Sequence, residues 1–169
     1  LEELPKLTFS KLVGNIPYYI TGKLLRVLSE LAKKPEVSVI TIQREVAERL
    51  SATPPKMNLL AAAVQIWGKP EILGYLKPTD FSPAPKVESA IIKITPEAKN
   101  VDLERFFRLA KAVFKQPRKT VLNNLSTGLG MSKEGVLVSL KKIGLSGQER
   151  PQNLDLKTLE KLSTIFFPK

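Results

Sequence analysis

The sequence predicts an α/β fold followed by a small all-helical domain, and three observations carry this prediction. Within residues 1–98, short β-branched runs alternate with leucines at helical spacing. Beyond residues 95–100, the apolar spacing is helical to the end of the chain. The composition, 43% hydrophobic and 25% charged, is that of a globular protein with an apolar core.

The first elements are a strand, a helix and a second strand. Residues 9–14 (FSKLVG) form the first strand, and residues 21–34 form a helix with Thr21 as its N-cap. Residues 37–43 (VSVITIQ) form the second strand, which continues into a short helix over residues 44–50. Alternation of this kind is typical of parallel strands in an α/β unit.

The rest of this part contains one helix and two more strands. Residues 51–56 are a loop, and the uniformly apolar residues 58–67 predict a buried helix. Residues 71–76 and 89–94 are strand candidates joined by the proline-rich segment KPTDFSPAPKVE. Two strands joined so closely predict an antiparallel edge to the sheet.

We therefore divide the chain into an α/β domain, residues 1–98, and a helical domain, residues 99–169. Asp102 is the expected N-cap of the first helix of the second domain, residues 103–116, which ends before Pro117. Three further helices are expected, over residues 118–125, 132–144 (with Ser132 as its cap) and 156–167.

Composition excludes several classes of chemistry. The sequence has no cysteine and no histidine, which rules out disulfides, thiolate nucleophiles, histidine bases and Cys/His zinc sites, and no metal site is expected. No run approaches the roughly 18 apolar residues of a membrane span, and the first residues are not a signal peptide. We therefore expect a cytoplasmic protein.

Positive charge is concentrated in the helical domain. The net charge is +11, with 13 basic and 10 acidic residues in 1–98 but 14 and 6 in the shorter 99–169. Such a distribution favours a polyanionic partner, nucleic acid first and a membrane surface second. A basic protein with no such partner is the alternative.

The tetrapeptide Asn15-Ile16-Pro17-Tyr18 follows the first strand, where ligands bind in sheets of this class. Pro17 has no N–H, so nearby carbonyls face the cleft, while Asn15 adds a side-chain acceptor and Tyr18 a flat face. Two acceptors beside a ring suit the exocyclic amino group of a flipped adenine. An ordinary turn with a core tyrosine is the alternative.

The chain resembles the small-subunit (16S) ribosomal RNA adenine N6,N6-dimethyltransferases, from about residue 8 to the end. Five segments in the family's order carry the resemblance: VGNIPYYIT (13–21), QREVAERL (43–50), FSPAPKVESAIIKI (81–94), VFKQPRKTVLNNL (113–125) and RPQNLDLKTLEKL (150–162).

This resemblance implies a Rossmann-like class I methyltransferase domain followed by a helical domain that docks on the small ribosomal subunit. Family members use S-adenosylmethionine to dimethylate two adjacent adenosines near the 3′ end of small-subunit RNA, with a role in subunit biogenesis. By resemblance, Asn15 contacts both cofactor and target amine, and the carbonyl of Ile16 or Pro17 accepts the second proton. Tyr18 stacks on the base, and Phe81 closes its other face, unless Phe81 is only a hydrophobic plug.

Basic residues supply the candidate contacts to RNA. Lys86 lies in the loop of Phe81, and the cluster KQPRK (115–119) is the strongest candidate for the RNA backbone. The expected contacts of the helical domain are Lys111, Lys115, Arg118, Lys119, Lys141, Lys142 and Arg150. A solvated surface position is the alternative for each. Arg44 is as well placed for an ion pair with Glu48 as for RNA.

The sequence departs from the family in its cofactor-binding part. Family members hold S-adenosylmethionine mainly through an N-terminal half with a glycine-rich turn, and residues 1–98 contain no G-x-G. We therefore expect this chain to correspond to the C-terminal part of such an enzyme and to bind the cofactor poorly alone. A monomer is the default expectation.

Three alternatives stay open. The related resistance methyltransferases act on large-subunit RNA, although the segments 116–125 and 150–156 favour the small-subunit type. A DNA adenine methyltransferase is the second alternative, and the tetrapeptide disfavours it, because those enzymes usually carry a second proline or an acidic first residue there. From another class, the chain could be a non-catalytic RNA-binding module for ribosome assembly, a hypothesis that the intact Asn15–Tyr18 tetrapeptide disfavours.

Overall fold

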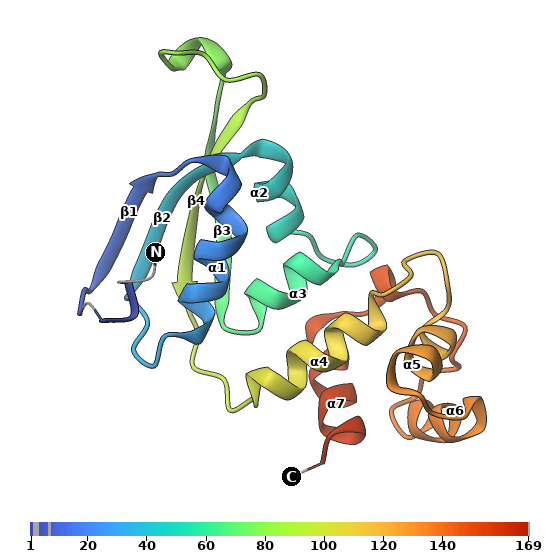
Figure 1. Ribbon diagram of the computed structural model, residues 1–169. Coiled ribbons are helices and arrows are strands. Elements are labelled where there is room, and N and C mark those ends of the chain that lie inside the picture. Colours follow the sequence, from blue (N-terminus) through green and yellow to red (C-terminus); the bar gives the residue numbers. More distant parts are fainter. Residues whose placement is uncertain (2–3, 7, 169) are drawn as a thin grey trace. The chain divides into compact units, whose positions relative to one another are not determined.

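The computed structural model describes residues 1, 4–6 and 8–168 of the chain (Figure 1). The chain divides into two compact units, which we call the sheet unit, residues 1–51 and 67–99, and the helical unit, residues 52–66 and 100–169. The expected division assigned residues 52–66 to the α/β part. They group instead with the helical unit, because helix α3 (Leu59–Gln65) contacts helix α4 (Leu103–Val113).

The sheet has four described strands in the order β1-β2-β4-β3. Their bounds are Lys11–Asn15 for β1, Val37–Gln43 for β2, Gly68–Leu76 for β3 and Ser89–Pro96 for β4. Strand β1 is parallel to β2, and β4 is antiparallel to both of its neighbours. The predicted parallel pair and the predicted antiparallel pair are both confirmed.

One face of the sheet is buried. Ile40 of β2 pairs with Ile92 of β4, Ile42 pairs with Ala90, and all four side chains are inaccessible to solvent. Alternation along a strand gives the opposite face to the intervening residues, and there Val13 of β1 is 79% exposed. The apolar core of this unit therefore lies mainly on one side of the sheet.

Helix α1 (Thr21–Glu30) makes the crossover between the parallel strands β1 and β2 (Figure 1). The sequence predicted a longer helix capped by Thr21. In the structure Ile20 is the N-cap residue, and Thr21 is a buried first helical residue without a capping hydrogen bond. The helix ends at Glu30 because the backbone of Leu31 is extended.

Strand register brings three segments together at the end of the sheet where β1 and β2 finish, which we call the site edge of the sheet. Asn15, at the end of β1, pairs with Thr41 of β2, whereas Ser89, at the start of β4, pairs with both Gln43 and Leu76. The turn after Asn15, helix α2 (Arg44–Leu50) and both ends of loop 77–88 therefore lie at this edge. The loop projects beyond the strand ends (Figure 1).

Side-chain caps define the helices of the helical unit, where an oxygen of the residue before each helix accepts a backbone N–H of the first turn. Besides α3 and α4, these helices are α5 (Val121–Leu129), α6 (Lys133–Lys141) and α7 (Leu156–Phe166). The predicted caps Asp102 and Ser132 are confirmed. Thr120 caps α5, which therefore begins later than predicted and runs to Leu129.

Helices α4 and α5 approach closely at a glycine. A Cβ atom on Gly128 would lie 2.7 Å from Cβ of Ala112, so only glycine fits without displacement. Both helices contribute fully buried side chains to the core of the unit, among them Phe106 and Leu109 of α4 and Leu125 of α5. None of the helices in the described part of the chain is both long and apolar enough to cross a membrane.

Candidate functional site

The turn after β1 presents two hydrogen-bond acceptors at the site edge of the sheet. Asn15 is exposed, and no described residue bonds to its side-chain amide. The carbonyl of Pro17 accepts the N–H of Ile20 at 3.1 Å, which closes the short 3₁₀ helix η2 (Tyr18–Ile20). Among the described residues no donor reaches the carbonyl of Ile16. Of the two carbonyls named from the sequence, that of Ile16 is the unoccupied acceptor.

Tyr18 is held at the far end of its ring. Its hydroxyl lies 2.6 Å from Oγ of Ser89, the fully buried first residue of β4. Tyr18 itself is half-buried, whereas the next residue, Tyr19, is 88% exposed. The tetrapeptide is therefore tied by a side-chain contact to the base of loop 77–88.

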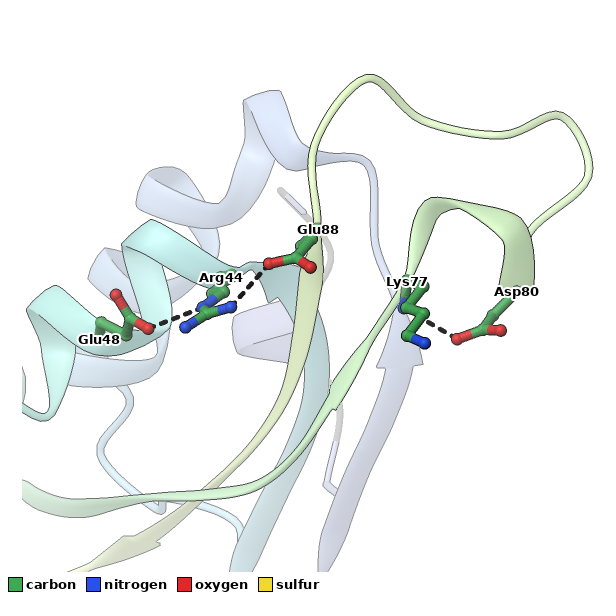
Figure 2. Close-up of polar contacts among 5 residues, drawn as sticks. All are labelled: Arg44, Glu48, Lys77, Asp80 and Glu88. Atoms are coloured by element: carbon green, nitrogen blue, oxygen red, sulfur yellow. Dashed lines mark hydrogen bonds and ion pairs between the residues drawn. The ribbon is translucent and has the colours of Figure 1, made fainter.

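Loop 77–88 carries the two other candidate residues of this edge. It begins with the 3₁₀ helix η3 (Pro78–Asp80), where the carboxylate of Asp80 accepts the backbone N–H of Lys77 at 2.8 Å (Figure 2). Phe81 follows η3 and is half-buried, and Lys86 is exposed. No hydrogen bond or ring contact between described residues links Phe81 to the turn of Asn15.

Arg44, the first residue of α2, fixes the return end of the same loop. Its guanidinium donates to Glu48 at 2.8 Å and to Glu88 at 2.7 Å (Figure 2). It also lies 4.7 Å from the centre of the Tyr75 ring, within the range of a cation–π contact. The hydrogen bonds to Glu48 and Glu88 raise the pKa of Arg44. The ion-pair interpretation of Arg44 is thus confirmed for Glu48, and Glu88 is a second partner that the sequence did not reveal.

The candidate RNA-contacting cations of the helical unit carry uncompensated charge. All seven are exposed, and within the described ranges none forms an ion pair: Lys111, Lys115, Arg118, Lys119, Lys141, Lys142 and Arg150. Arg105 differs, because it pairs with Asp102 at 3.0 Å and donates to the carbonyls of Phe167 and Pro168.

A buried amide shapes the basic turn, which we define as residues 115–119. Oδ1 of Asn124 accepts the N–H of Gln116 at 3.0 Å. Nδ2 of Asn124 donates to the carbonyl of Gln116 at 2.9 Å and to that of Lys119 at 3.3 Å. Asn124 is 2% exposed, so the turn is attached to the core of the unit while its cationic side chains stay in solvent.

One more candidate cation is tied to this region by the backbone. The N–H of Val121, which follows the basic turn, donates to the carbonyl of Glu149 at 2.8 Å, and Arg150 is the next residue. Burial would raise the pKa of the Glu149 carboxyl, but hydrogen bonds from Ser146 and Gly147 outweigh burial and lower it. Lys141 and Lys142 lie at the end of α6, and no described hydrogen bond connects them to the basic turn.

Residues 7–159 match the sequence profile of a family described as "Ribosomal RNA adenine dimethylase". The chain belongs to the ribosomal RNA adenine dimethylase family. Among its curated relatives, the "Ribosomal RNA small subunit methyltransferase A" of Dehalococcoides mccartyi strain 195 is 39% identical to the chain over 92% of the chain's length. The protein of that name from Halothermothrix orenii is 35% identical over 94%. The chain spans about half the length of these relatives, 55% and 56% respectively.

Two solved structures have the same fold as this chain. A dimethyladenosine transferase from Plasmodium falciparum superposes with a TM-score of 0.77 at 26% identity, covering 92% of this chain and 66% of its own. The 23S rRNA methyltransferase ErmE superposes with a TM-score of 0.69 at 20% identity, covering 93% and 65%. Both support the predicted Rossmann-like methyltransferase fold.

Sequence reasoning did not single out Ser89 or Asn124 in this dimethylase family member. Asn124 is a polar residue at a position where the helical pattern calls for an apolar one, whereas alternation along β4 places Ser89 on the face opposite Ala90 and Ile92. Ser89 is the buried first residue of β4, and Asn124 lies between the buried Val121 and Leu125 on α5. A buried polar group needs a hydrogen-bond partner, and this requirement is the signal in the sequence that could have identified Asn124, whereas the strand pattern does not mark Ser89 as buried.

Proposed function

We propose that the protein containing this chain is an S-adenosylmethionine-dependent enzyme that dimethylates N6 of two adjacent adenosines near the 3′ end of small-subunit ribosomal RNA. The observation that carries the proposal is the pair of unoccupied acceptors, the Asn15 amide and the Ile16 carbonyl, beside the Tyr18 ring. Family membership and the names of the curated relatives support the substrate.

The pair of acceptors suits the reactivity of the adenine amino group. The N6 lone pair is delocalised into the ring, so the planar amine is a weak nucleophile. Before the first transfer, when N6 carries two protons, hydrogen bonds from both of them to Asn15 Oδ1 and the Ile16 carbonyl favour a pyramidal nitrogen whose lone pair is no longer delocalised into the ring. No histidine base is needed, in keeping with a sequence that contains none.

Aromatic faces hold the base outside its stack. Tyr18 and Phe81 belong to segments that emerge at the site edge of the sheet, and each is half-buried. Stacking on an aromatic side chain is worth about 1–3 kcal/mol per base and does not depend on the base's identity. The two acceptors then restrict the target to a base with an exocyclic amino group, a requirement that adenine meets and uracil does not.

S-adenosylmethionine, when bound, supplies the electrophilic methyl group. The exposed amide of Asn15 fits one contact to it, at the strand end where such ligands bind. The glycines of residues 1–98 are Gly14, Gly22, Gly68 and Gly74, and no two of them form a glycine-rich turn. We infer that residues 1–169 alone bind the cofactor weakly. Micromolar affinity by titration calorimetry with this chain would contradict that inference.

The cations of the helical unit position the RNA in this proposal. Exposed lysines and arginines without acidic partners gain affinity by releasing counterions from phosphates, so they bind any sequence. Lys86 adds one such contact from the loop that carries Phe81. The enzyme then works as a monomer on the small ribosomal subunit, a substrate that places it in the cytoplasm.

The test uses the product of the complete reading frame that encodes this chain. The protein and its Asn15→Ala variant are incubated with S-adenosylmethionine and unmethylated small subunits, and the digested RNA is analysed by mass for N6,N6-dimethyladenosine. We expect product from the parent and from Asn100→Ala, which changes another exposed asparagine, and none from Asn15→Ala.

Two outcomes would replace the proposal. Binding of small subunits without any product from the parent would indicate a non-catalytic assembly module. Product on isolated large-subunit RNA, with none on small subunits, would indicate an enzyme of the resistance type.

A further inference from the structure

Ser89 and Glu88, adjacent residues at the base of loop 77–88, contact two different elements of the site edge. The hydroxyl of Ser89 lies 2.6 Å from that of Tyr18. The carboxylate of Glu88 accepts from Arg44 at 2.7 Å, and its backbone carbonyl accepts the N–H of Arg44 at 3.0 Å. The site proposed above does not otherwise use these two residues.

Ser89 is fixed from both sides. It pairs with Gln43 of β2 and with Leu76 of β3, and it is completely buried. The backbone before it is held by Arg44, whose guanidinium also lies over the ring of Tyr75. The Ser89 hydroxyl therefore has a nearly fixed position in the frame of the sheet.

Tyr18 has no comparable support from its own backbone. It begins η2, a three-residue 3₁₀ helix that follows the end of β1 and takes no part in the strand pairing. Free rotation about χ1 and χ2 would let its ring move within the turn. The hydrogen bond to Ser89 restrains the far end of the ring, and so restrains both angles.

We propose that Ser89 is a positioning residue that sets the plane of the Tyr18 ring on which the target base stacks. This inference rests on the proposed function, because it assigns Tyr18 to the base. It explains why a tyrosine, rather than a phenylalanine, serves as the stacking residue: the hydroxyl is the point of attachment. Holding a catalytic group in place before the substrate arrives removes an entropic cost from the reaction.

A double-mutant cycle tests the proposal in the product of the complete reading frame. Ser89→Ala and Tyr18→Phe each remove the same hydrogen bond, from opposite ends, and Tyr18→Phe keeps the ring. We expect each variant to lower kcat about 3- to 10-fold, a loss of about 0.7–1.4 kcal/mol in transition-state stabilisation. The double variant should be no slower than the slower single variant, and KM for small subunits should stay within twofold.

Ser38→Ala is the matched control, because Ser38 is also a buried serine of the sheet but pairs with Ile94 at the other end of β4. It should leave kcat unchanged. Three results would each overturn the role of Ser89. The losses in kcat could be additive in the cycle, kcat could be unchanged in Ser89→Ala and Tyr18→Phe, or Ser38→Ala could lower kcat equally. An inactive parent protein would instead overturn the proposed function, so the two failures are distinguishable.

Discussion

The side-chain amide of Asn124 pairs with the backbone of Gln116 through both of its polar groups. Its oxygen accepts the N–H of Gln116 at 3.0 Å, and its nitrogen donates to the carbonyl of Gln116 at 2.9 Å. A third bond reaches the carbonyl of Lys119. Aspartate lacks the donor and leucine lacks both groups, so no residue of similar size can replace this amide.

Replacing Asn124 by leucine should destabilise the protein and weaken RNA binding without changing the charge. Leaving backbone groups unpaired costs about 1–3 kcal/mol, and the basic turn loses its attachment to the core. Unfolding in urea gives the stability, and RNA titration at fixed salt gives the affinity. Asn123→Leu is the control, since Asn123 is a half-buried neighbour whose side chain makes no bond to the basic turn. Equal RNA affinity in both variants would contradict the prediction.

Removing charge from the basic turn should reduce the salt dependence of RNA binding. The double variant Lys115→Gln/Lys119→Gln loses two unpaired cations, and each lost phosphate contact lowers the slope of log K against log salt by about 0.7–0.9. A total decrease of about 1.4–1.8 is expected for this pair. Lys33→Gln/Lys69→Gln, which removes the same charge from the sheet unit, should leave the slope nearly unchanged. The same decrease in both pairs would show that only net charge matters.

Gly128→Ala should destabilise the helical unit although alanine is the better helix former. The new Cβ would meet Ala112 at 2.7 Å from Cβ and 3.0 Å from Cα. Overpacking costs about 1–3 kcal/mol, which exceeds the roughly 1 kcal/mol gained from helix propensity. Gly22→Ala in α1 is the control, because its Cβ would have nothing within 4 Å. We expect the control to raise the unfolding midpoint; a rise in Gly128→Ala would show that the crossing can relax.

The N-cap of α7 should weaken at low pH. Hydrogen bonds from the side chain and backbone N–H of Thr158 lower the pKa of Asp155 in the folded protein. A lowered folded pKa means that the stabilisation is fully present above the unfolded pKa of about 3.9 and is lost as pH falls through the folded pKa.

Because Asp155 is exposed, Asp155→Ala should cost about 1 kcal/mol or less at pH 7 and less at pH 3. Asp155→Asn, which keeps a capping oxygen, should remove most of this pH dependence in urea unfolding. A constant effect of Asp155→Ala across pH would contradict the prediction.

Local patterns predicted the elements well where the signals were continuous. The β-branched run of β2 and the helix α2 that follows it have the bounds expected from the sequence, Val37–Gln43 and Arg44–Leu50. The end of α1 was predicted too late, because Leu31 continues the leucine spacing although its backbone is already extended. Apolar spacing in the sequence indicates which residues are buried, and a buried residue just after a helix can fit the same spacing as one inside it.

The candidate site was predicted only in its local part. The tetrapeptide and the basic cluster are contiguous in sequence and could be read directly. The contacts that hold the tetrapeptide and loop 77–88 join residues far apart, such as Tyr18 with Ser89 and Arg44 with Glu88, and depend on strand register. A single sequence carries no direct signal for register between non-adjacent strands. The grouping of residues 52–66 with the helical unit was missed because it rests on contacts between α3 and α4, two helices far apart in the sequence.

That grouping limits how the protein can be cut or recombined. The helical unit is assembled from two separate stretches, 52–66 and 100–169, with thirty-three residues of the other unit encoded between them. A truncation that begins at residue 100 would lack α3, along with the buried Met57, Ala61 and Ala62. A chimera that exchanges this unit between relatives must therefore graft two segments at three junctions. Recombination at a single breakpoint near residue 99 would combine residues 100–169 of one parent with the α3 of the other parent within the same unit.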